Sequence, residues 1–446
     1  MPDPRDTAVD DAIAEPEIVG RAANARRASL RRRRFLVTGV IALTFYGYAW
    51  LIQPNRPQLR SVFDDPPRLV NITERGILPA DAKTPLAIYQ QGHWGWIGAW
   101  YDQFHYAREA RALARFQIPG AHWDRVHQVP SPDAPTTGEV ASFNFGLGYP
   151  AVGAVFAWLG FRGDPFVVPD GLLFALSAML ALALAERLLR PSTALVVVNA
   201  LVLTGPFVLY FVIPYSTSLT IVAVLSTLLA LTSDRFSWRF GIGVGIAVSL
   251  AFAARYSEIM WLLLLLVPLV WRWRETWRVL VAVAASLGIT AILVGAAQQV
   301  AFGSPFDTPY TFSHGGTDAS LAAYKFARIP RNFVGVFFVG KRQLLFGVGP
   351  ILRSFPWALL APVGLFLLLR AGHRLRWHFL LAAIVGAAST AFFSSYYAGG
   401  PNDLILWTIR YHLSWFPLWA VLAGVAIERS LAALTGDRAL TATVER

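Results

Sequence analysis

The chain alternates apolar runs with short polar turns, and one polar segment is much longer than the rest. The longer runs reach the roughly 20 residues that a helix needs to cross a bilayer, and several runs are shorter. The runs fall at 35–52, 166–185, 193–213, 216–231, 240–254, 259–270, 279–297, 355–369, 379–396 and 411–427. Two more apolar segments, 143–161 and 332–352, are interrupted by Pro150 and by Lys341-Arg342. The pattern predicts an all-α polytopic membrane protein with about 10–12 transmembrane helices.

The N-terminal boundary of the first run predicts the orientation of the chain. Residues 1–34 begin acidic and Pro/Ala-rich and end in arginine clusters at 26–27 and 31–34, which predicts a disordered basic tail. Positive charge beside an apolar run stays cytoplasmic. A cleaved signal peptide is disfavoured because no small-residue cleavage site follows the run. The N-terminus is therefore expected inside, and the polar segment 53–142 becomes a large first extracytoplasmic loop.

The remaining basic turns test this orientation independently. Basic residues gather at 186–190, 234–239, 272–278 and 370–376. All four turns fall on the cytoplasmic side if 143–161 does not cross and if 332–352 either does not cross or forms a hairpin. The predicted membrane domain is then 35–427, and residues 428–446 form a cytoplasmic C-terminal tail.

Composition supports this class and excludes several kinds of chemistry. Of the 446 residues, 55% are hydrophobic and 15% are charged, whereas a soluble domain carries about 25% charged residues. Much of the net charge of +12 lies beside apolar runs, which indicates topology and contact with membrane lipids, not nucleic acid. The absence of cysteine excludes thiolate catalysis, disulfides and Cys-ligated metal.

Candidate chemistry gathers around Asp102 in the long outer loop. Residues 104–116 alternate apolar and charged positions at helical spacing, which predicts a short helix at the membrane surface. A carboxylate held there can take a proton from a hydroxyl group, so Asp102 is the candidate catalytic base. The alternative is a solvated or helix-capping acid beside an interfacial aromatic belt. Neighbours that can contact a sugar or an acceptor are Trp100, Tyr101, His105 and Tyr106.

A second candidate cluster lies between two apolar runs, where Arg255 precedes Glu258. Charges so close to hydrocarbon usually line a cavity or pair with one another. One interpretation is a phosphate-binding Arg255 beside an acceptor-facing Glu258. The other is an ion pair that satisfies itself within a turn.

The last apolar run begins with a third candidate group, Arg410-Tyr411. A guanidinium can hold a phosphate through two parallel hydrogen bonds, and the alternative for Arg410 is a snorkelling interfacial arginine. Lys341 and Arg342 add positive charge for the same task, and Tyr411 is a candidate acceptor contact. No metal ligands are assigned, because no His/Glu spacing matches a metal signature; a divalent cation stays a minor alternative.

In their order along the chain these fragments resemble the GT-C superfamily of integral-membrane glycosyltransferases. The resemblance covers most of 35–427. It is carried by Tyr101-Asp102, Tyr106-Ala107-Arg108, Gly148-Tyr149-Pro150, Ala254-Arg255, Phe302-Gly303-Ser304-Pro305-Phe306, Gly399-Gly400, Arg410-Tyr411 and Pro417. Many members carry two acids close together in the first outer loop, whereas here Gln103 follows Asp102.

The resemblance implies a mannosyltransferase-like enzyme of the plasma (inner) membrane that uses a polyprenyl-phosphate sugar. The acid in the first outer loop is then the catalytic base of an inverting transfer, which maps onto Asp102. The arginine that engages the donor phosphate maps onto Arg410, with Arg255 as a second position. The acceptor is a cell-envelope glycan, a glycolipid or a protein on the extracytoplasmic face, and no cofactor is implied with certainty.

Three alternatives stay open from the sequence. A carrier or flippase for lipid-linked sugars would need polar groups near the bilayer midplane, and here they cluster at the outer helix ends. A glycan polymerase or ligase shares large outer loops and arginines but needs no catalytic acid. A catalytically inactive GT-C-like protein is the third.

Overall fold

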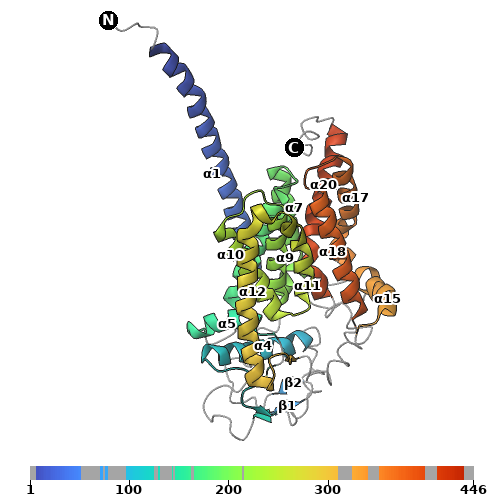
Figure 1. The fold of residues 1–446 in the computed structure, drawn as a ribbon. Helices are drawn as coiled ribbons and strands as arrows, with labels where there is room; N and C mark the ends of the chain where they lie inside the picture. The colour runs from blue at the N-terminus through green and yellow to red at the C-terminus, as the bar shows by residue number, and fades with distance from the viewer. Residues whose placement is uncertain are drawn as a thin grey trace.

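The computed structural model describes residues 7–51, 71–73, 76–78, 97–124, 129–130, 143, 146–161, 165–212, 215–309, 324–339, 351–396 and 409–435. Figure 1 shows a bundle of roughly aligned helices, with α1 extending from one end. The longer helices are α1 (Thr7–Leu51), α4 (Ile97–Ala114), α5 (Gly148–Trp158), α6 (Val167–Ala185), α7 (Pro191–Val202), α8 (Gly205–Val212), α9 (Thr217–Leu231), α10 (Trp238–Ala254), α11 (Glu258–Trp271), α12 (Trp273–Phe302), α17 (Ala361–Arg370), α18 (Arg376–Ser395) and α20 (Phe416–Thr435).

Short elements connect the longer helices. The helical ones are α15 (Ile329–Val334), α16 (Ile351–Ser354), a π-helical turn at Gly335–Val339, and 3-10 turns at Phe326–Arg328, Pro356–Leu360 and Leu413–Trp415. Two small antiparallel hairpins lie in the first loop: β1 (Asn71–Thr73) with β2 (Gly76–Leu78), and β3 (Trp123–Asp124) with β4 (Val129–Pro130).

The apolar runs predicted from the sequence are helices. Among the described residues, five helices are long and apolar enough to cross a membrane: Ala28–Leu51 within α1, α6, α12, α18 and Ile409–Thr435, which contains α20. Five shorter apolar helices accompany them: α7, α9, α10, α11 and Pro356–Arg370, which contains α17. The chain is therefore an integral membrane protein, and the all-α polytopic class is confirmed.

One predicted run is interrupted. The segment 193–213 forms two helices, because α7 ends at Val202 and α8 begins at Gly205. Pro206 has no backbone N–H and its ring clashes with a preceding helical turn, so it suits the first turn of α8 and not a continuation of α7. The prediction of one continuous helix here was wrong, and Gly205-Pro206 is the local reason.

Both terminal helices extend beyond the predicted spans. The helix α1 begins at Thr7, so it includes most of the segment for which the sequence predicted a disordered tail. Ala, Glu and Arg make up most of residues 10–34 and have high helix propensity, which explains the extension. At the other end, α20 continues to Thr435, past the predicted boundary at 427.

The two ambiguous apolar segments do not cross the bundle where they are described. Figure 1 shows α4 and α5 lying crosswise to the long helices at one end of the bundle. α5 has 11 residues, which span about 16 Å at 1.5 Å per residue, well below the roughly 30 Å hydrocarbon core. In the second segment α16 packs against the π-helical turn. The described parts at the two ends of 332–352 therefore lie side by side.

The centre of the bundle is α9, whose 15 residues are all buried. It packs against α6, α10 and α11. Its side chains are apolar or small hydroxyls on every face, as expected of a helix surrounded by other helices. Hydroxyls such as that of Thr227 donate to the carbonyl four residues earlier, which satisfies them inside the helix.

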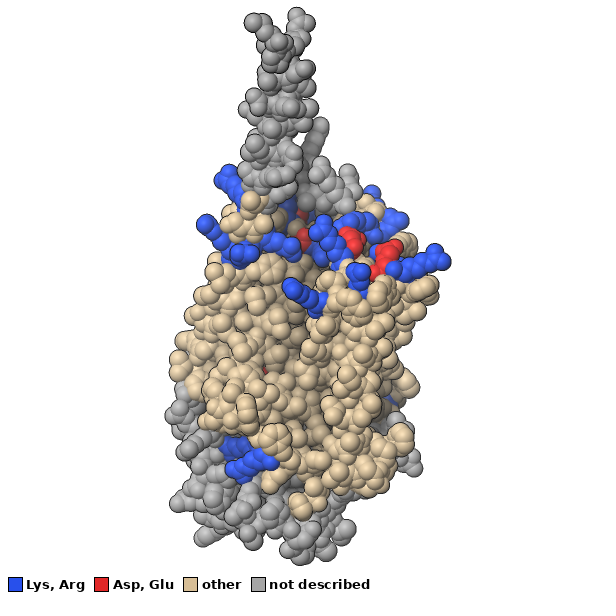
Figure 2. Space-filling model, turned by 60° about the vertical axis from the view of Figure 1, so that its left-hand side comes forward, with Lys and Arg blue, Asp and Glu red and all other residues tan. Residues whose placement is uncertain are grey.

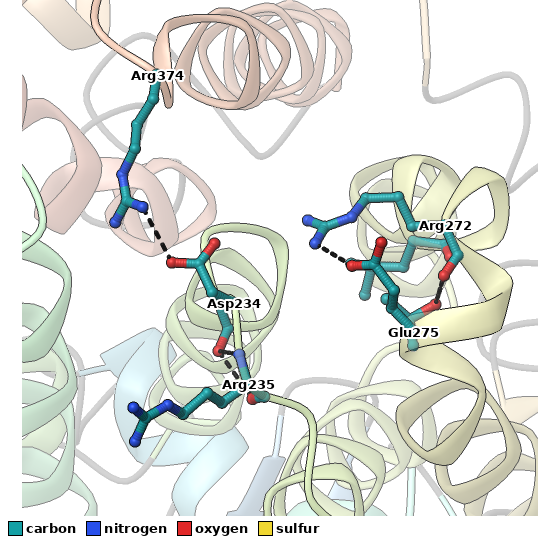
Figure 3. Close-up of polar contacts among 8 residues, drawn as sticks. Asp234, Arg235, Arg272, Glu275 and Arg374 are labelled. Carbon is teal, nitrogen blue, oxygen red and sulfur yellow. Dashed lines mark hydrogen bonds and ion pairs between the residues drawn. The ribbon is translucent and has the colours of Figure 1, made fainter. Parts of the chain in front are cut away.

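Charged side chains form a band at the end of the bundle from which α1 extends (Figure 2). The Arg31 guanidinium lies 2.9 Å from Glu186, and Arg374 lies 3.2 Å from Asp234. Figure 3 shows this second pair beside the pair formed by Arg272 and Glu275. The four basic turns predicted to share one side therefore share one end of the bundle. Which side of the membrane that end faces stays a prediction.

Candidate functional site

The candidate site lies at the end of the bundle opposite the charged band, beside α4. The helix α10 runs from the band to Ala254, and α11 returns from Glu258 to the band at Arg272. The turn between them is therefore far from the band. Arg255 ends the α10 helix in an extended conformation, and its backbone N–H still donates to Ala251 O at 2.8 Å. This geometry turns the Arg255 side chain away from the helix axis and into the bundle end.

Arg255 is buried and has two partners. Its Nη1 lies 3.5 Å from Glu258 Oε1, and its Cζ lies 4.7 Å from the centre of the Tyr411 ring. The ion pair that the sequence offered as one interpretation is therefore present. The same guanidinium also packs on Tyr411 of the last membrane helix. An ion pair that only stabilised the local turn would not need this long-range contact.

Arg410 meets the same tyrosine. Its Cζ lies 5.0 Å from the Tyr411 ring centre and 4.8 Å from that of Tyr215, and its Nη2 donates to the Tyr411 hydroxyl at 3.1 Å. Aromatic faces attract cations, so these contacts fix the orientation of the guanidinium. Two arginines far apart in the sequence therefore converge on Tyr411, and they bring concentrated positive charge to one place.

An aromatic wall holds Tyr411 in position. Its ring stacks on Phe393 of α18 at 4.9 Å with an interplanar angle of 10°. Tyr396 lies edge-on to it at 5.9 Å and is in turn packed against Tyr324 at 5.0 Å. Asn332 Nδ2 donates to the carbonyl of Tyr396 at 3.2 Å. The wall therefore joins the start of the last helix, the end of α18 and the segment around α15.

The buried face of α4 closes another side of the site. The Tyr106 hydroxyl donates to Ser216 Oγ at 3.3 Å, and Ser216 follows the Tyr215 that contacts Arg410. Glu109, one turn further along α4, is fully buried. Burial raises the pKa of Tyr256, which neighbours Arg255, and the Glu109 carboxylate raises it further.

His105 and Asp102 lie on the same helix. His105 is buried, and this burial, with the nearby Arg108, lowers the pKa of its imidazole to about 3. Position 102 is one helical turn before Tyr106 and two before Glu109, so it shares their face of the helix. The side chains of Trp100, Tyr101 and Asp102 lie outside the described residues, as do Lys341 and Arg342.

The sequence-predicted residues thus divide into three groups. Arg255 and Arg410 both contact Tyr411, and Glu258 pairs with Arg255. Tyr106 joins this group through Ser216 and Tyr215, and His105 is buried beside it on α4. The remaining five candidates have no described side chain.

Two residues were not identified from the sequence: Tyr215 in the site, and Asp170, which is hydrogen-bonded to Ser218 in the turn that follows Tyr215. Tyr215, under Arg410, looks like an ordinary interfacial aromatic. Asp170 is an acid among apolar residues of α6, and that alone could have marked it, because ionisable groups among membrane helices are usually functional. Within the described part of the chain, no three acidic, histidine or cysteine side chains gather as a metal site would require.

Comparison with known proteins supports the fold. No protein-family model matches the sequence, and no curated protein matches it. ArnT from Cupriavidus metallidurans bound to undecaprenyl phosphate matches the structure with a TM-score of 0.52 at 16% sequence identity, over 90% of this chain and 62% of ArnT. ArnT in the apo state gives 0.42 at 18% identity, over 74% and 57% of the two chains. The chain therefore spans less than two thirds of ArnT.

The likeness to ArnT confirms the GT-C-like fold that the sequence predicted. At this level of identity the likeness concerns the path of the chain and carries no residue roles with it.

Proposed function

We propose that this protein is a glycosyltransferase that moves a sugar from a polyprenyl-phosphate donor to an acceptor hydroxyl on the extracytoplasmic face of the plasma membrane. The observation that carries the proposal is the convergence of Arg255 and Arg410 on Tyr411 at one end of a GT-C-like bundle. The neighbour with this fold binds undecaprenyl phosphate, a lipid whose charged head group needs such a site.

The donor phosphate is assigned to the two arginines. A guanidinium presents several N–H donors in a planar fork and stays protonated at all relevant pH values. The Arg255 charge is partly offset by Glu258, whereas Arg410 contacts two tyrosine rings. A phosphate beside both gains charge-assisted hydrogen bonds in a partly buried setting. Lys341 and Arg342 are proposed to add charge as the lipid phosphate departs.

Asp102 is assigned as the general base. Its carboxylate accepts the proton of the acceptor hydroxyl while the hydroxyl oxygen attacks the anomeric carbon of the sugar from the side opposite the phosphate. The bond between the anomeric carbon and the phosphate oxygen breaks, and the polyprenyl phosphate leaves with both electrons. This single displacement inverts the anomeric centre, and the arginines stabilise the charge that develops on the leaving phosphate.

The acceptor and sugar are proposed to lie between α4 and the α10–α11 turn. Contacts are assigned to Trp100, Tyr101, His105, Tyr106, Glu258 and Tyr411. Since burial keeps the His105 imidazole neutral at pH 7, it can donate one hydrogen bond and accept another but carries no charge to an acceptor. A glycan, glycolipid or protein hydroxyl fits this neutral, aromatic environment.

The test is sugar transfer in liposomes by purified protein, with a panel of radiolabelled polyprenyl-phosphate sugars and crude cell-envelope acceptor. Asp102→Asn should lose transfer by about 100-fold or more, since general acid–base catalysis contributes roughly 10²–10⁴-fold, while donor binding persists. Asp234→Asn makes the same chemical change in the charged band, and should transfer at the wild-type rate.

Other outcomes would overturn the proposal in recognisable ways. Movement of the donor lipid across the bilayer without transfer, equal in wild type and Asp102→Asn, would indicate a carrier. Transfer that survives Asp102→Asn but not Arg410→Gln would indicate a polymerase or ligase that works without a catalytic acid.

A further inference from the structure

Asp170 is a buried carboxylate in the first turn of α6, at the end of the bundle that holds the candidate site. Its two oxygens accept hydrogen bonds from two other elements. The Tyr149 hydroxyl of α5 donates to Oδ2, and Ser218 Oγ of α9 donates to Oδ1 at 3.3 Å. Burying a carboxylate among apolar helices costs free energy that an apolar side chain would not. Packing alone therefore does not explain why position 170 is an aspartate.

The first partner, Tyr149, is part of the surface on which α4 packs. Its fully buried ring lies edge-on to Tyr106 of α4 at 4.9 Å and flat against Phe166 at 4.4 Å. The helices are also close: a Cβ atom on Gly153 of α5 would lie 3.1 Å from the Ala110 Cβ of α4. A shift of Tyr149 would therefore move α4.

The second partner, Ser218, belongs to the turn that lies under Arg410. Tyr215 in this turn contacts the Arg410 guanidinium, and Ser216 accepts the hydrogen bond from Tyr106. The single Ser218 O–H is shared between Asp170 and the Tyr215 carbonyl, which lies 3.0 Å from Oγ, so this three-centre hydrogen bond also closes the turn. A shift of Ser218 would therefore move the ring on which Arg410 rests.

We propose that Asp170 is a positioning residue that fixes α4 against the Tyr215–Ser218 turn, and so sets the separation between position 102 and Arg410. The inference rests on the proposed function, in which those two residues carry base and phosphate roles. Asp170 is proposed to act through Tyr149 and Ser218 and is assigned no contact with a substrate. Its effect is geometric: a displacement of about 1 Å between reacting groups can lower a rate roughly 100-fold.

The kinetic test compares Asp170→Ala, Asp170→Asn and Tyr149→Phe with wild type. The Ala variant should lower kcat by about 10- to 100-fold, with KM for the donor changed by less than about 3-fold, because the displaced group belongs to the reacting geometry. Asn keeps one acceptor oxygen and should recover part of kcat. Tyr149→Phe removes a single hydrogen-bond donor to Asp170, so its kcat should be close to that of Asp170→Asn.

Glu428→Gln is the matched control. Glu428 is also buried among helices, and its Oε2 accepts the Arg190 backbone N–H at 3.1 Å near the charged band. This variant should lower the melting temperature and leave kcat unchanged. Asp170 variants that lower only the melting temperature, as Glu428→Gln does, would overturn the positioning role.

A second measurement does not depend on transfer. Because the chain has no cysteine, nitroxide labels can be placed at Arg115→Cys after α4 and at Lys325→Cys beside the aromatic wall. The distance distribution should broaden or shift in Asp170→Ala and stay unchanged in Glu428→Gln. An unchanged distribution in Asp170→Ala overturns the inference even if wild type transfers sugar. A wild type without transfer overturns the proposed function, and the distances still decide the placement of α4.

Discussion

Tyr411 holds two guanidinium groups near one ring, at 4.7 and 5.0 Å from its centre. Each cation–ring contact contributes roughly 0.5–2 kcal/mol, but two positive charges so near each other also repel. Glu258 offsets this repulsion at Arg255. A bound phosphate would offset it at both arginines, so we expect the pair to bind an anion more tightly than either arginine would alone.

Arg410→Gln should weaken binding of a polyprenyl phosphate by about 10- to 100-fold, because charge-assisted hydrogen bonds contribute roughly 1.5–3 kcal/mol. Arg410→Lys should recover part of the affinity, since it restores the charge without the planar fork. Titration calorimetry of the detergent-solubilised protein measures both. Arg374→Gln, in the charged band, is the matched control, and equal affinities for Arg410→Gln and wild type would remove Arg410 from the phosphate site.

The burial of His105 is expected to make the folded protein sensitive to acid. Its folded-state pKa is about 3, whereas an unfolded histidine has a pKa of about 6.5. Below pH 6.5 the unfolded chain takes up a proton that the folded chain does not, so the contribution of this residue to stability is lost progressively as pH falls from 6.5 towards 3. The loss approaches about 1.4 kcal/mol for each pH unit.

Melting temperatures between pH 7 and pH 4 should therefore fall less steeply for His105→Gln than for wild type. The exposed His122 provides the control, and His122→Gln should retain the wild-type slope. Identical slopes for all three proteins would show that His105 titrates normally.

At the scale of elements, glycines decide how closely helices approach. Gly364 of α17 faces α20, and a Cβ atom built on it would overlap the carbonyl oxygen of Leu422. Gly243 of α10 has nothing within 4 Å of such an atom. A side chain at position 364 would therefore clash with α20, whereas position 243 has room for one. Neither glycine has an unusual backbone conformation.

Gly364→Ala should destabilise the protein by about 1–3 kcal/mol, since overpacking forces backbone shifts. Gly243→Ala should be neutral or slightly stabilising, because alanine loses less entropy in a helix. Thermal unfolding followed by size-exclusion chromatography in detergent distinguishes the two. A pair of variants with equal stability would mean that α17 can move away from α20 without cost.

At the scale of the whole molecule, the charged band and the candidate site lie at opposite ends of the bundle. Charged residues form a band at the end from which α1 extends (Figure 2), and α4 crosses the opposite end (Figure 1). Arg255 and Arg410 lie at that opposite end, at the turn between α10 and α11. By the positive-inside rule we predict that the band faces the cytoplasm and the candidate site faces outward.

Single cysteines in this cysteine-free chain test the orientation. A membrane-impermeant maleimide should label Lys325→Cys in right-side-out vesicles and Arg274→Cys in inside-out vesicles, because both positions are exposed at opposite ends. Permeabilised vesicles, in which both should react, control for reactivity. The reverse labelling would place the site in the cytoplasm.

The sequence by itself determined the membrane class, the helices and the grouping of basic turns, because these depend on local hydrophobicity and on charge beside each run. It also marked Arg255, Glu258, Arg410 and Tyr411 as unusual, since charged or polar groups at helix ends need partners. It missed the break at Gly205-Pro206, although the signal there is local.

Only the tertiary structure decided that Arg255 and Arg410 share Tyr411, and that Asp170 ties α5 to α9 beside α4. These contacts join residues far apart along the chain, and no periodicity within one helix records which face meets which neighbour. Helix packing sets that, through close approaches such as Gly153 against Ala110. The physical reason is that hydrophobicity selects which segments are helices, whereas shape and hydrogen bonding select how they meet.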